Sequence, residues 1–239
     1  MNPTPTNPTT EQPPKSVVRP RWFSAKELLV ALLVLFLATP AFAVLKQGEL
    51  IEAVLVTAVL LSAVLAVSGR RGTLVVAIVL LLPALVGQWL DHFHPGVLPA
   101  WVFQAAFLTF LGFVVVNLFG FVMRASRVDS EVLCAGVAIY ILLGLIWANA
   151  YILAAQSSSP AFALAVPDGN AQVMGRFNAL YFSFITLSTV GFGDIVPVSR
   201  LARTLTMLEA ITGLFYMGIF IARLVSLYST AAKSEGVKR

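Results

Sequence analysis

The chain has 239 residues, of which 59% are hydrophobic and only 11% are charged, and its mean hydropathy is +0.89. That composition excludes a soluble globular domain of this length and indicates an integral membrane protein. The net charge of +5 does not point to a nucleic-acid partner, because the basic residues stand between apolar runs.

The N-terminal residues 1–25 are predicted to form a disordered cytoplasmic tail, because they include six prolines and few apolar side chains. The first apolar run follows at 28–45, and two interpretations of it stay open. Its basic flank and the sequence Ala41-Phe42-Ala43 fit a cleaved secretory signal, whereas its length fits a retained transmembrane helix. We favour the retained helix.

Later apolar runs predict further membrane-spanning helices, because each approaches or exceeds the roughly 20 residues that cross a bilayer core of about 30 Å. They lie at 50–67, 74–90, 97–123, 132–155 and 201–228. Together with the first run, they predict an all-α membrane protein with six transmembrane helices.

A shorter apolar and aromatic segment at 176–188 stands between the last two runs, after a polar loop at 156–175. This segment is predicted to be a helix that enters the membrane without crossing it. Such a re-entrant element must be buried in protein or line water. We therefore expect it to be stable only inside an assembly.

The distribution of Lys and Arg predicts the orientation of the chain. With the N-terminus inside, the inner segments hold eleven basic residues and the outer segments hold four, and Arg223 lies near the inner end of the last helix. Because inner loops carry the excess of positive charge, both termini are predicted to be cytoplasmic. The loop that follows 176–188 then opens to the outer side.

Residues 189–193 read Thr-Val-Gly-Phe-Gly, and Asp194 follows them. Two glycines at alternate positions allow left-handed φ values that a side chain opposes. With Val190 and Phe192 beside them, such a segment can turn successive carbonyls to one side. Since a column of carbonyl oxygens replaces the hydration shell of a cation, the string predicts a cation site made by the backbone.

The order of a short helix, this glycine string, an aspartate and a spanning helix resembles the pore module of the bacterial-type tetrameric potassium channels, over residues 176–229. The resemblance implies a potassium-selective channel that conducts passively, with permeant K⁺ ions and no cofactor. It also implies a homotetramer, because one chain carries one filter string. The location that it implies is the lipid bilayer of a bacterial inner (plasma) membrane.

The resemblance gives a role to each residue of the string. The Thr189 hydroxyl closes the innermost ion site, and Asp194 lies at the outer mouth. The ion-coordinating carbonyls are those of Thr189, Val190, Gly191 and Phe192, and Gly193 completes the strand. In the preceding helix, the carbonyls near Thr186 and Ser188 point toward the membrane centre, where the negative end of the helix dipole favours a cation.

Tyr181 and Phe182 match positions at which the family has bulky aromatic residues that brace the filter, and packing against lipid is the alternative for both. Two positions depart from the family's pattern. Some members have a carboxylate behind the filter where this chain has Ile185, and the filter tyrosine is Phe192 here. Both departures bear on the rigidity of the filter more than on the choice of cation.

On the last run, Gly213 matches the bending point of the family's inner helix, and small-residue helix packing is the alternative. Leu214 and Met217, on the following turn, are expected to line the cavity below the filter. Glu209 is a carboxylate inside a membrane-spanning helix, which makes it a functional candidate. The other interpretation is that Glu209 pairs with polar backbone behind the filter, and the sequence leaves both open.

These elements predict a four-helix membrane domain at 26–123, a pore domain at 131–230 and a short cytoplasmic tail at 231–239. Six-span channels that sense voltage carry Arg or Lys at every third residue of the fourth helix. This chain has no basic residue in its fourth run before Arg124, so the four-helix domain is predicted not to be a voltage sensor. No gating stimulus is indicated.

Two alternatives to a potassium channel stay open: a non-selective cation channel, and a membrane subunit or transporter that does not conduct. Transporters are typically built of repeats with broken helices in both halves, and the sequence predicts a single re-entrant element. We expect no enzymatic function, because the sequence contains no recognisable nucleophile–base pair or metal-ligand cluster.

Overall fold

The computed structural model describes residues 25–42, 48–69, 71–93, 99–157, 160–164 and 174–236. The predicted N-terminal tail, except its last residue, and the middle of the polar loop at 156–175 lie outside the described residues. The described elements are, in chain order, α1 (Ala25–Phe42), α2 (Gly48–Val67), α3 (Arg71–Phe93), α4 (Ala100–Arg124), α5 (Ser130–Ser157), β1 (Phe162–Leu164), α6 (Arg176–Leu187), β2 (Ile195–Pro197) and α7 (Arg200–Gly236).

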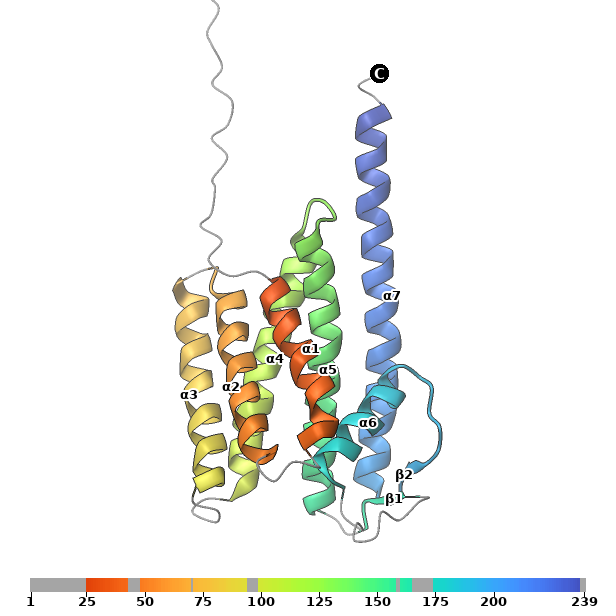
Figure 1. Ribbon diagram of the computed structural model, residues 1–239. Helices are drawn as coiled ribbons and strands as arrows, with labels where there is room; N and C mark the ends of the chain where they lie inside the picture. Colours follow the sequence, from red (N-terminus) through yellow and green to blue (C-terminus); the bar gives the residue numbers. More distant parts are fainter. Residues whose placement is uncertain are drawn as a thin grey trace, which may run out of the picture.

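Long helices packed side by side form the fold (Figure 1). α1 packs against α2 and α5, and α4 packs against α3 and α5. The short helix α6 lies against α5 and α7, at one end of both. Apolar side chains of α1 to α5 form one continuous core that reaches α7 at Tyr216. α5 is therefore the helix that joins the α1–α4 group to α6 and α7.

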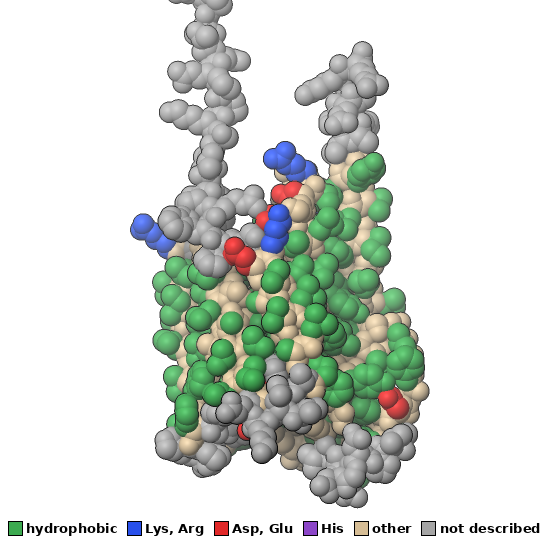
Figure 2. All heavy atoms as spheres, in the orientation of Figure 1, with side chains coloured by type: hydrophobic (Ala, Val, Ile, Leu, Met, Phe, Trp, Pro, Cys, Tyr) green, Lys and Arg blue, Asp and Glu red, His purple; other side chains and the backbone are tan. Residues whose placement is uncertain are grey.

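Five helices of the described chain are long and apolar enough to cross a membrane, namely α2, α3, α4, α5 and α7. Apolar side chains cover most of the lateral surface seen in Figure 2, as lipid contact requires. The protein is therefore a multi-pass integral membrane protein. α1 has 18 residues and is not among the five helices, so the sixth transmembrane helix stays a prediction.

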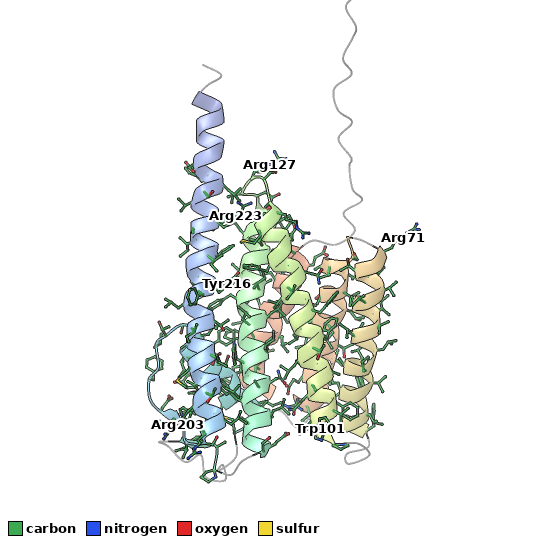
Figure 3. The ribbon with its side chains drawn as sticks, turned by 180° about the vertical axis from the view of Figure 1, so that it is seen from behind. Arg71, Trp101, Arg127, Arg203, Tyr216 and Arg223 are labelled. Atoms are coloured by element: carbon green, nitrogen blue, oxygen red, sulfur yellow. The ribbon has the colours of Figure 1, made fainter. Side chains whose placement is uncertain are left out.

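Three arginines from different elements lie toward the same end of the molecule. Figure 3 shows Arg71, Arg127 and Arg223 toward this end, and Trp101 and Arg203 toward the other. These three arginines belong to segments that the charge pattern groups on one side of the membrane. That this side is cytoplasmic stays a prediction.

Several helix boundaries and one small sheet differ from the prediction. α4 begins later than predicted, at Ala100, because Pro99 is its N-cap and the residue before a proline is disfavoured in a helix. α7 continues past its predicted end to Gly236, through a segment that includes the helix-forming residues Ala231, Ala232, Lys233 and Glu235. The strands β1 and β2 pair antiparallel, with Phe162 opposite Pro197, and the all-α prediction omitted them. Strands of three residues are too short to show a periodic hydrophobic pattern.

Candidate functional site

The loop after α6 takes the backbone conformation that its alternate glycines allow. Gly191 and Gly193 have φ values of 53° and 80°, and Thr189 has a φ of 60°. For the β-branched Thr189, a left-handed conformation costs about 1–2 kcal/mol. The Thr189 N–H donates a hydrogen bond to the Thr186 carbonyl at 2.9 Å, which helps to hold this conformation.

The next two N–H groups of the loop point back to α6. Those of Val190 and Gly191 both donate to the carbonyl of Ile185, at 2.9 Å and 3.1 Å. The carbonyls of residues 189–192 accept no hydrogen bond from any residue that the structure describes. Because residues 189–192 are exposed in the single chain, these carbonyls are open to water or to a cation.

Asp194 fixes the other end of the loop. The Tyr181 hydroxyl donates a hydrogen bond to Asp194 Oδ2 at 2.7 Å, and the Ile195 N–H donates to Asp194 Oδ1 at 3.0 Å. Ile195 begins β2, which pairs with β1. The loop is thus tied to α6 at both ends, through Ile185 at its start and through Tyr181 at its finish.

Phe182 lies in a buried aromatic cluster behind α6. Its ring centroid is 4.9 Å from that of Tyr151 on α5 and 5.5 Å from that of Phe162 on β1. The Phe182 side chain is 4% exposed in the single chain, so packing against lipid does not hold for this ring. The cluster instead supports the side of α6 that faces α5.

α7 approaches the end of α6 at Gly213. A Cβ at this position would lie 2.1 Å from the Leu187 carbonyl oxygen, far inside normal contact distance. A glycine is therefore required here by helix packing, whereas a bending point at Gly213 stays a prediction. The side chains of Leu214 and Met217, predicted to line the cavity, are 68% and 44% exposed in the single chain.

Glu209 does not pair with the backbone behind the loop. Its side chain is fully buried, at 0% exposure. The Tyr151 hydroxyl donates a hydrogen bond to Glu209 Oε2, and the Ser183 hydroxyl donates to Glu209 Oε1 at 2.5 Å. The sequence analysis singled out Glu209 but missed both partners, because an isolated hydroxyl in an apolar run does not indicate a distant carboxylate.

The fold and the loop define the class of protein. Two long helices, α5 and α7, flank a short helix, and the loop after this helix presents carbonyls without partners in the described chain. Residues 111–230, which are 120 of the 239 residues, match the family model described as ion channel. Since the match covers half of the chain, the protein belongs to this ion channel family.

Curated potassium channels are similar over short segments. The calcium-gated potassium channel TvoK of Thermoplasma volcanium is 38% identical over 52 residues, which are 22% of this chain and 15% of that protein. The two-pore potassium channel 4 of Arabidopsis thaliana is 43% identical over 49 residues, 20% of this chain and 17% of that protein. The voltage-gated potassium channel Kch of Escherichia coli is 41% identical over 59 residues, 25% of this chain and 13% of that protein.

The matched segments thus cover less than a fifth of each of these three relatives. No solved structure matches the chain.

Proposed function

We propose that the chain is the subunit of a potassium-selective channel through which K⁺ crosses the membrane passively. The loop at 189–193 carries this proposal. Positive φ values alternate along it, the Val190 and Gly191 N–H groups bond to α6, and its carbonyls lack partners in the described chain. Such oxygens can replace the water around K⁺. The similar proteins are potassium channels by name, which favours potassium as the ion.

In this proposal, the site residues have distinct roles. Asp194 lies at the outer mouth, the Thr189 hydroxyl closes the innermost ion site, and Tyr181 and Phe182 brace the loop. The C-terminal end of α6, near Thr186 and Ser188, directs its negative dipole toward the cavity. The filter residues are Thr189, Val190, Gly191, Phe192 and Gly193, and the cavity residues are Leu214 and Met217.

The proposed assembly is a homotetramer, because a single loop cannot surround an ion and potassium filters use four such loops. Phe192 is 71% exposed in the single chain, as expected if a neighbouring subunit covers it. α7 also exposes large apolar side chains along its length, at Leu214, Phe215 and Val225 among others. Native mass spectrometry of the purified protein should give a tetramer, and only monomers and dimers would contradict this assembly.

The proposed topology has six spans, with α1 as the first, and both termini in the cytoplasm. Residues 26–123 form the four-helix domain and residues 131–230 form the pore domain. The hydrogen bond of Arg223 on α7 to the end of α4 supports a direct connection between the two domains at their inner ends, with Nη2 2.8 Å from the Met123 carbonyl.

Reversal potentials of the purified protein in planar bilayers test the proposed activity. Under opposed K⁺ and Na⁺ gradients, the current should reverse near the potassium equilibrium potential. A reversal near zero would favour a non-selective cation channel. The absence of current from a protein that is shown to be tetrameric would favour a non-conducting subunit.

A further inference from the structure

Glu209 lies deep in the protein without an opposite charge beside it. Ion pairs in the described part of the chain include Lys26 with Glu131 and Arg176 with Glu52, and Glu209 is in neither of them. A buried carboxyl is costly unless its oxygens are hydrogen-bonded, and isolated ionisable groups within membrane-spanning segments usually have a function. The contacts of Glu209 therefore need an explanation beyond filling space.

These contacts join three helices at one point. Glu209 on α7 accepts hydrogen bonds from Tyr151 on α5 and from Ser183 on α6. The Ser183 hydroxyl is also 2.8 Å from the carbonyl of Gly144 on α5. A single carboxyl thus links α7 to α6 and to α5.

A second contact between α6 and α7 lies one helical turn further along both helices. Ser183 contacts Glu209, and Leu187 contacts Gly213. The two residues on α6 are four positions apart, and so are the two on α7. Residues at this spacing lie on one face of a helix. The two contacts therefore set the position of α6 along α7 and its rotation.

The carbonyl that anchors the loop lies between these two contacts. Ile185 stands two residues after Ser183 and two before Leu187, and its carbonyl accepts the N–H groups of Val190 and Gly191. A shift of α6 relative to α7 would move this carbonyl, and the loop backbone would move with it.

We infer that Glu209 is a positioning residue for the selectivity filter: its carboxyl holds α6 in register with α7, and α6 in turn holds the filter backbone. The inference rests on the proposed potassium selectivity. It assigns Glu209 to the support of the filter and not to the lining of the cavity.

The test compares the K⁺/Na⁺ permeability ratios of substituted channels in planar bilayers. Glu209→Gln should keep a ratio close to that of the native channel, because an amide oxygen can accept from Tyr151 while the amide N–H₂ donates to Ser183. Glu209→Leu has a similar size but bonds neither hydroxyl, so the ratio should fall by roughly tenfold or more, as expected for a lost buried hydrogen bond in each subunit. Thr204→Val is the matched control, since the Thr204 hydroxyl bonds only the Arg200 carbonyl of its own helix.

Ser183→Ala keeps the test decisive if Glu209→Leu does not assemble. This substitution removes the bond from Ser183 to Glu209 and the contact with the Gly144 carbonyl, but it keeps the bond from Tyr151 to Glu209. It should lower the ratio in the same direction, with the tetramer intact by native mass spectrometry. An unchanged ratio in Ser183→Ala, or a loss in Glu209→Gln as large as in Glu209→Leu, would overturn the inference. A native channel without potassium selectivity would instead refute the proposed function itself.

Discussion

The hydroxyl of Tyr181 on α6 donates a hydrogen bond to the carboxylate of Asp194, which follows the glycine loop, across 13 positions of the chain and at 2.7 Å. Some members of the potassium channel family that the sequence resembles have a carboxylate at the position of Ile185. Tyr181 therefore bonds the C-terminal end of the loop to α6, and this bond involves neither Ile185 nor Phe192, the two positions that depart from the family's pattern.

Tyr181→Phe should shorten the conducting state of the channel. The substitution keeps the ring but removes the hydrogen bond to Asp194, so the ordered loop is held less firmly against a collapsed one. Open times in single-channel recordings measure the change. Tyr228→Phe, at a side chain 76% exposed near the end of α7, is the control and should leave the open times unchanged.

Gly191→Ala and Gly193→Ala should each abolish potassium selectivity without preventing membrane insertion. The native φ values of 53° and 80° oppose a Cβ, and the strain is about 1–2 kcal/mol in each subunit. Gly112→Ala on α4 is the control, because no atom lies within 4 Å of the added Cβ. The measurement is potassium flux into vesicles. A flux equal to that of the native channel in either variant would mean that the loop is not the filter.

Gly213→Ala should weaken the contact between α7 and α6. The added methyl would lie 2.1 Å from the Leu187 carbonyl oxygen, so the two helices must separate, at a cost of roughly 1–3 kcal/mol. Gly218→Ala tests the same helix at a site with no atom within 4 Å of the added Cβ. The thermal midpoint of the detergent-solubilised protein should fall for Gly213→Ala and should not fall for Gly218→Ala. Equal midpoints would contradict the packing role of Gly213.

The helices were predictable from the sequence because hydropathy is a local property. The short helix was predicted at 176–188, and α6 spans Arg176–Leu187 with Ser188 as its C-cap. The glycine string that follows ends this helix and permits the positive φ values at Gly191 and Gly193. Both features depend on residues that are adjacent in the chain, so a single sequence is enough to reveal them.

Contacts between distant segments were not predictable in this way. Phe36 on α1 contacts Phe184 on α6, with ring centroids 4.9 Å apart, although the sequence analysis assigned the two to separate domains. The partners of Glu209 were missed for the same reason, since Tyr151 is 58 positions away. Helices that are apolar on all sides carry no pattern that shows which face meets which neighbour.

Arg223→Met should destabilise the contact between α7 and the end of α4. Nη2 of Arg223 donates to the carbonyls of Met123 and Ala125, at 2.8 Å and 2.6 Å, where the negative end of the α4 dipole favours a positive charge. Hydrogen bonds to a charged group contribute about 1.5–3 kcal/mol, so the thermal midpoint should fall. Arg127→Met removes an exposed arginine of the α4–α5 connector and should have little effect. A midpoint that changes equally in both variants would contradict a role for the Arg223 contact.

The channel should show weak intrinsic voltage dependence. Moving one charge through the whole membrane field is worth about 2.3 kcal/mol per 100 mV, and steep gating uses roughly three or four charges in each subunit. α4 has no Lys or Arg before Arg124, which is its last residue and is exposed at the end of the helix. Open probability in planar bilayers, measured from about −120 to +120 mV, should therefore change only gradually. A sigmoidal dependence with an effective charge above about four per channel would show that the chain contains a voltage sensor outside the fourth helix.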